Sequence, residues 1–130
     1  MIVVDSSVWI AHLRNQNVPA VQHLSDLTLT DKILVGDIVL TEVLQGARND
    51  AHAAQLEQWL TRFPVVAMVG SELAVQAAHY YRLMRARGFT MNKIADLYIG
   101  TFCIQHGHEL LQCDADFQPM ATLCGLRLLS

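Results

Sequence analysis

Short apolar runs alternate with longer amphipathic stretches along the whole chain. The apolar runs occupy residues 2–5, 33–36, 65–69 and 110–113, with 126–129 as a candidate fifth. Helices are predicted between them at 7–14, from Pro19 onward, and at 38–46, 51–62, 71–87 and 91–106. The runs are continuous rather than alternating, which is typical of strands covered on both faces. Together they predict an α/β fold with a parallel central sheet and helices on both sides.

Polar residues and glycines mark the expected helix ends. Ser6 and Ser7 can cap the first helix, Asp37 the helix at 38–46, and Ser71 the long helix that Gly88 ends. Strand, turn and helix therefore follow one another without an internal repeat or a linker. A chain of 130 residues fits one domain, which we expect to span residues 1–130.

Hydrophobic residues make up 52% of the chain and the mean hydropathy is +0.27. This hydrophobic content is high for a short chain, so we expect part of the apolar surface to face a partner. No uncharged apolar run reaches the ~18 residues of a membrane span. The N-terminus lacks a basic region and meets an acid at Asp5, which argues against a signal peptide and for a cytoplasmic location.

The charge and the cysteine content argue against several classes of protein. Three cysteines without a CxxC pair signal neither a disulfide framework nor a zinc ribbon, so we expect buried thiols. His106 and His108 flank Gly107, which favours a solvated loop over a zinc site. A net charge of −3 argues against a general nucleic-acid binder.

Acidic residues follow two of the predicted strands. Asp5 ends the first, and Asp114 and Asp116 follow the fourth. In parallel sheets, ligands bind beyond the carboxyl ends of the strands. Two simpler interpretations stay open at this point. Asp5 could only cap the next helix, and the Asp-Ala-Asp segment could be a solvated turn.

Two further acids lie inside predicted helices. Asp96 shares a helix face with Ile99, Gly100 and Cys103, where a carboxylate is costly unless it is paired or binds a metal. Glu42 lies in a helix that is apolar almost all round. The alternatives are an ion pair of Asp96 with Lys93, three residues earlier, and a partly exposed face for Glu42.

Carboxylates gathered from separate elements repel one another. At ~5 Å and an effective dielectric constant of ~20, two of them repel by roughly 3 kcal/mol. A hard divalent cation such as Mg²⁺ or Mn²⁺ relieves this repulsion and prefers carboxylate and water oxygens. Such a site can activate water for phosphodiester hydrolysis. The acids thus favour a metal-dependent nuclease, provided that they converge.

Four blocks of the sequence resemble the PIN-domain family. The opening MIVVDSSVWI resembles the first block, with Asp5 followed two residues later by Ser7. Residues 38–46, 88–104 and 110–117 resemble the second, third and fourth blocks, with acids at Glu42, at Asp96, and at Asp114 and Asp116. The blocks keep the family's order over nearly the full chain. The short length is similar to that of VapC toxins from VapBC toxin–antitoxin pairs.

The resemblance implies a three-layer α/β/α sandwich and a Mg²⁺- or Mn²⁺-dependent endoribonuclease that leaves a 5′-phosphate and a 3′-hydroxyl. It implies that Asp5, Asp96, Asp114 and Asp116 bind metal, that Glu42 joins them in catalysis, and that Ser7 orients a carboxylate or water. It further implies a VapB-like antitoxin, a homodimer, and a heterotetramer or larger complex that reaches DNA only through the antitoxin. A catalytically inactive PIN module and a phosphatase on a similar sheet are the alternatives.

This sequence departs from the family pattern at Asp37 and at Met91–Asn92. We interpret Asp37 as a helix cap. Residues 91–92 replace the usual Ile-Arg, which leaves Lys93 as the nearer phosphate contact. The cluster Arg82, Arg85, Arg87 and Lys93 holds four of the nine basic residues and is a candidate RNA-binding segment, although an ordinary solvated face has the same pattern. Bound cations would offset the acids and answer the objection from net charge.

Overall fold

A five-stranded parallel sheet forms the centre of the computed structural model, which describes all of residues 1–130. The strands are β1 (Ile2–Val4), β2 (Ile33–Gly36), β3 (Val65–Val66), β4 (Glu109–Leu111) and β5 (Arg127–Leu129). Their order across the sheet is β3-β2-β1-β4-β5, and every pair is parallel. The predicted parallel sheet is confirmed, including the candidate fifth strand. The third strand is shorter than expected, since residues 67–69 are not paired.

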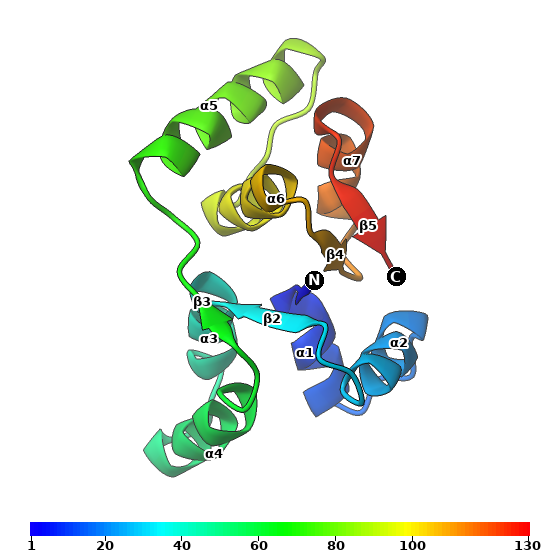
Figure 1. Ribbon diagram of the computed structural model, residues 1–130, viewed down its shortest axis with the longest axis vertical. Coiled ribbons are helices and arrows are strands. Elements are labelled where there is room, and N and C mark those ends of the chain that lie inside the picture. The colour runs from blue at the N-terminus through cyan, green and yellow to red at the C-terminus, as the bar shows by residue number, and fades with distance from the viewer.

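Seven helices and one 3₁₀ turn surround the sheet. They are α1 (Ser6–Leu13), α2 (Pro19–Leu27), α3 (Asp37–Leu44), α4 (Asp50–Leu60), α5 (Ser71–Ala86), α6 (Ile94–His106), the turn η1 (Ala115–Phe117) and α7 (Gln118–Cys124). Figure 1 shows two groups, with α1 to α4 on one side of the sheet and α5 to α7 on the other. The three-layer α/β/α architecture is therefore confirmed. None of these helices combines the length and apolar composition that crossing a bilayer requires.

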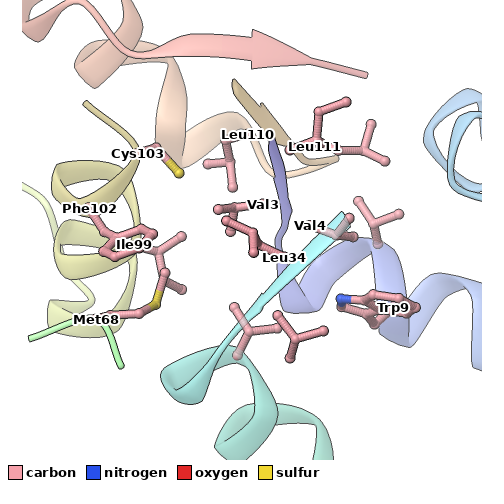
Figure 2. Close-up of a cluster of buried hydrophobic side chains, with 14 of the residues drawn as sticks. Val3, Val4, Trp9, Leu34, Met68, Ile99, Phe102, Cys103, Leu110 and Leu111 are labelled. Carbon is pink, nitrogen blue, oxygen red and sulfur yellow. The ribbon is translucent and has the colours of Figure 1, made fainter. Parts of the chain in front are cut away.

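The side chains that pack on β1 come from both helix groups. Val3 and Val4 are fully buried in the central strand. In the view of Figure 2, Ile99 of α6 and Trp9 of α1 lie on opposite sides of this strand. The strand is thus enclosed, which explains why its sequence is a continuous apolar run. The residue that follows it, Asp5, is consequently drawn into a buried position, with 2% of its surface exposed.

Several predicted helix ends are wrong by a few residues. The first helix is capped by Asp5, and Ser6 is its first helical residue. Ser71 is likewise the first residue of α5, behind Gly70. The helix expected from residue 91 begins only at Ile94, because the backbone before it is extended. Helix α3 ends at Leu44, two residues before Gly46, and α4 ends at Leu60.

Helix α7 and the turn before it were not predicted. The signals were present, because Pro119 lies at the start of α7 and Gly125 follows its end with a φ of 82°. Proline near the start and glycine past the end are characteristic of helices. At only 7 residues, α7 has too few positions to show a clear amphipathic period.

Two expectations about single residue types are partly wrong. Only Cys103 is a buried thiol, whereas Cys124 is partly exposed and Cys113 is exposed. His106 is not in a solvated loop but is the last residue of α6. The His106 and His108 rings pack against Phe102, with centroids 4.4 and 5.8 Å from it.

Asp37 joins two parts of the fold rather than acting as a helix cap. It is the first residue of α3, and its Oδ1 accepts hydrogen bonds from the Ile38 N–H at 2.9 Å and the Met68 N–H at 3.2 Å. Met68 follows the short strand β3 and is buried. The departure from the family pattern at this position therefore has a structural reason.

We expect Asp37→Ala to lower the free energy of unfolding by about 1 kcal/mol more than Asp50→Ala, since a hydrogen bond to the Met68 N–H is lost. Asp50 is the matched control because it also opens a helix with an exposed acid. Denaturant unfolding measures both changes. Equal losses in the two variants would show that the bond to Met68 contributes nothing.

Candidate metal centre

The ends of β1 and β4 bring Asp5 and Asp114 toward the same edge of the sheet. These strands are neighbours, with Val4 opposite Leu111, and the Asp5 N–H donates to the Leu111 carbonyl at 2.9 Å. Asp114 follows β4 and caps η1 by accepting from the Asp116 N–H at 2.9 Å. The Asp-Ala-Asp segment is therefore a turn, as the simpler interpretation held, but a turn placed beside Asp5.

Helix α6 adds Asp96 to this edge. Asp96 lies in the first turn of α6 and is only 4% exposed, and its neighbours Ile99, Gly100 and Cys103 on the same face are all buried. One carboxylate oxygen each from Asp96, Asp114 and Asp116 lie within 4.8 Å of one another. Three acids from two separate segments thus converge, as the sequence predicted.

Asp5 and Ser7 form a fixed unit next to this trio. The Asp5 Oδ2 accepts from the Ser7 N–H at 3.0 Å and from the Ser7 hydroxyl at 2.5 Å. The same hydroxyl oxygen accepts from the Cys113 N–H at 3.3 Å, which links the end of β4 to the start of α1. Asp5 therefore does cap a helix. That role occupies only Oδ2, because the buried Oδ1 has no hydrogen-bond partner.

Glu42 approaches the same region from α3. It is half-buried, so the interpretation of a partly exposed helix face is correct to that extent. Burial and the charge of Asp5 raise its pKa, while the Ser6 side chain and the charge of Lys93 lower it. Glu42 is outside the trio but interacts electrostatically with Asp5 and Asp96.

The acidic centre comprises Asp5, Glu42, Asp96, Asp114 and Asp116. Burial and neighbouring negative charges disfavour the ionised forms of Asp5, Glu42 and Asp96. Burial raises the pKa of Asp96 to about 7, with further increases from the charges of Asp5, Asp114 and Glu42 and an opposing effect of Lys93. Burial also raises the pKa of Asp5, although its bonds to Ser7 lower it. Without a cation, part of the cluster is therefore protonated near neutral pH.

Three buried carboxylate oxygens have no hydrogen-bond partner: Asp5 Oδ1, Glu42 Oε1 and Asp96 Oδ2. An unsatisfied buried oxygen is rare in folded proteins and costs stability. The charge of Lys93 reaches Asp96, but no hydrogen bond from Lys93 satisfies Oδ2, so an ion pair does not explain this acid. A set of carboxylate oxygens without nitrogen or sulfur donors fits Mg²⁺ or Mn²⁺.

The four basic residues singled out in the sequence divide into two groups. Arg82, Arg85 and Arg87 are exposed on α5 and at its end, with the Arg85 guanidinium 5.8 Å from the Tyr81 ring centroid. Lys93 lies immediately before α6, and its charge lowers the pKa of Glu42 and Asp96. Lys93 is thus the basic residue that acts on the acidic centre.

Two neighbours of the acids were not among the site residues predicted from the sequence. Ser6 acts on Glu42, and burial together with the charge of Asp5 raises the pKa of the Cys103 thiol to about 12. Cys103 lies on the helix face of Asp96, which was a usable signal. Ser6 was interpreted only as a helix cap because its partner is distant in the sequence.

A protein-family model described as PIN domain matches residues 2–123. Among curated proteins, the chain is 28% identical to "Ribonuclease VapC11" of Mycobacterium tuberculosis, over 100% of this chain and 98% of the relative. The resemblance seen in the four sequence blocks is therefore confirmed along the whole chain.

Solved structures with the same fold include "FitAcB from Neisseria gonorrhoeae", with a TM-score of 0.78, 20% identity, and coverage of 100% of this chain and 97% of the other. A second is "VapBC2 from Rickettsia felis bound to a DNA fragment from their promoter", with a TM-score of 0.70, 16% identity, and coverage of 99% and 98%. At these identities the structures establish the shared fold.

We expect Asp96→Asn to flatten the pH dependence of stability in metal-free protein. The unfolded chain ionises this carboxyl near its ordinary pKa of 3.8, whereas the folded protein holds the proton until about pH 7. Folding therefore takes up a proton in this window, and stability falls as pH rises through it. The variant should lose roughly 2 kcal/mol less between about pH 4 and about pH 8, a value reduced for solvent screening.

Denaturant unfolding in the presence of a chelator measures this difference. Asp116→Asn is the matched control, because it removes one acid from the exposed part of the same trio. Parallel stability curves for wild type and Asp96→Asn would show that Asp96 is not held protonated by its surroundings.

Proposed function

The chain belongs to the PIN-domain family, and we propose that it is a divalent-metal-dependent endoribonuclease acting as the toxin of a toxin–antitoxin pair. The observation that carries the proposal is the convergence of Asp96, Asp114 and Asp116 beside two more acids. Support also comes from a full-length relative named as a ribonuclease. The proposal includes the dependence on Mg²⁺ or Mn²⁺ and a cytoplasmic place of action.

Four acids of the centre are the proposed metal ligands. Asp96, Asp114 and Asp116 present oxygens close together, and Asp5 adds the buried Oδ1 that has no other partner. When bound, the ion neutralises the acids, binds the substrate phosphate and activates the attacking water. Glu42 contributes negative charge near Asp5 and an oxygen that can hold a water molecule.

Two further residues have positioning roles in this proposal. The Ser7 hydroxyl fixes the orientation of Asp5 by donating to Oδ2, which leaves Oδ1 free. Lys93, immediately before α6, adds a positive charge beside the acidic centre. This charge partly offsets the negative charges of Asp96 and Glu42, and the side chain can contact a phosphate of the RNA. An acidic protein can thereby bind a polyanion at one local site.

We propose a VapB-like antitoxin and a second copy of the chain as protein partners, with DNA bound only through the antitoxin. The crystal structure of Rickettsia felis VapBC2 bound to a fragment of promoter DNA supports this assembly. A mostly apolar groove between α5 and α6 supports it as well, since its lining includes Tyr81, Met91 and Ile94, of which Ile94 is 65% exposed.

Asp5→Asn or Asp96→Asn should abolish cleavage of RNA, a loss of at least about 100-fold, because either change removes a metal-binding oxygen and its charge. The assay follows a mixed pool of single-stranded RNA incubated with Mn²⁺ or Mg²⁺, with a chelator as the metal-free reference. Asp50→Asn is the control, because it removes an exposed acid from α4 without touching the centre.

The same variants separate an enzyme from an inactive binding module. Mn²⁺ should raise the melting temperature of wild type but not of Asp96→Asn, since ion binding stabilises only a folded protein that has the ligands. An inactive module would show the stabilisation without RNA cleavage. Cleavage that persists in the chelator, or in Asp96→Asn, would contradict the metal-dependent mechanism.

Charge reversal of Arg85 and Arg87 together should weaken RNA binding and flatten its dependence on salt, because each phosphate contact releases counterions. The slope of log affinity against log salt should fall by about 1.4, since each of the two contacts on a single strand contributes roughly 0.7. Reversal of Lys32 and Arg62, two exposed basic residues in other parts of the fold, is the control. Equal effects of the two pairs would show that only net charge matters and that α5 does not contact RNA.

A further inference from the structure

A cavity shares one wall residue, Asp116, with the acidic centre. It has a volume of about 200 Å³, and Asp116 is one of the trio of converging acids. The rest of the wall comes from two segments. One is the end of α5 with the connection to α6, and the other is the stretch from η1 into α7, which contributes Pro119. Whatever occupies this cavity is therefore adjacent to the proposed site of phosphodiester cleavage.

The connection between α5 and α6 has a defined backbone. Gly88 adopts a φ of 87°, a left-handed conformation that glycine adopts without strain. The next residue, Phe89, donates its N–H to the Met84 carbonyl at 3.0 Å, which closes the end of α5. The position of Phe89 at the cavity is thus set by the helix terminus, although its side chain remains 47% exposed.

The wall combines apolar and hydrogen-bonding groups without a positive charge. Phe89, Met84 and Pro119 provide aromatic and aliphatic surface, while Thr90 and Asn92 provide a hydroxyl and a carboxamide. The single charged group is the Asp116 carboxylate, which would repel a phosphate. A planar, uncharged group with polar edges fits this combination, and the bases of single-stranded RNA are recognised by aromatic stacking and edge hydrogen bonds.

We propose that this cavity binds the base of a nucleotide next to the scissile phosphate, with Phe89 stacking on the base and Asn92 and Thr90 reading its edge. The inference rests on the proposed ribonuclease function and assigns part of its sequence specificity to the connection between α5 and α6. Asp116 then faces the cavity on one side and the acidic centre on the other.

The first test compares cleavage of a random-sequence RNA pool by wild type, Phe89→Ala, Phe89→Tyr and Asn92→Leu, with sequencing of the ends. Wild type should favour one or two bases at one position next to the cut. Phe89→Ala should lower kcat/KM by roughly 5- to 150-fold, as expected for a lost stacking contact. Phe89→Tyr should keep the wild-type kcat/KM, because tyrosine retains an aromatic ring. Asn92→Leu should broaden or change the preferred base with a smaller effect on rate.

The control is Val75→Ala, which trims an exposed apolar side chain of α5 outside the cavity. It should leave both the rate and the base preference unchanged. If wild type cleaves no RNA, the proposed function itself fails. If wild type cleaves but Phe89→Ala and Asn92→Leu cut the same sites at wild-type rates, only the base-binding inference is overturned.

A binding experiment tests the contact without relying on cleavage. Fluorescein-labelled oligoribonucleotides with the preferred cut sequence carry a methylene group in place of the 3′-oxygen at the cut, so that the linkage cannot be hydrolysed. They are titrated with otherwise wild-type protein in Mg²⁺, with and without an abasic nucleotide beside the cut. The abasic substitution should weaken binding to protein that retains Phe89 by roughly 5-fold or more. It should have little effect when Phe89→Ala is also present. Equal effects in both backgrounds would place the base elsewhere and overturn the inference.

Discussion

Mutual repulsion of carboxylates is the constraint on which the rest of this structure depends. Asp5 and Asp96 are almost completely buried, and Glu42 and Asp114 add negative charge to the same region. Isolated buried charges are unstable in a protein interior, so such a cluster persists only if its acids take up protons or a cation. The sheet, the start of α1 and the first turn of α6 hold the acids together against this repulsion. In our proposal, a bound divalent ion relieves this repulsion.

The neighbouring parts of the molecule can be understood from this constraint. Ser7 satisfies one oxygen of Asp5 and leaves the other free, and Lys93 partly offsets Asp96 and Glu42. The cavity at Phe89 has no positive group and shares Asp116 with the acids. In our account the phosphate and the base of one substrate are therefore bound by separate surfaces. In the proposed complex, the acidic centre with its ion holds the phosphate, and the cavity at Phe89 holds the base.

Much of this arrangement could be predicted from the sequence, because it depends on local patterns. The apolar runs located the strands, and the buried face of Asp96 followed from helical spacing. Other features depend on contacts between distant segments. The bond from Asp37 to Met68 spans 31 positions, and the effect of Ser6 on Glu42 also joins separate elements. Helix α7 was missed because 7 residues are too few to show periodicity, and the cavity at Phe89 becomes visible only when α5, η1 and α7 are assembled.

The most direct test of the central claim is anomalous diffraction from crystals of the protein grown with Mn²⁺. The account predicts an anomalous peak for Mn²⁺ within ligand distance of oxygens of Asp96, Asp114 and Asp116. It predicts that Asp5 binds the same ion. It also predicts that Asp96→Asn crystals grown in the same way lose this peak. Ordered Mn²⁺ only at other places on the surface, with the five acids bonded to protein groups or water alone, would contradict it.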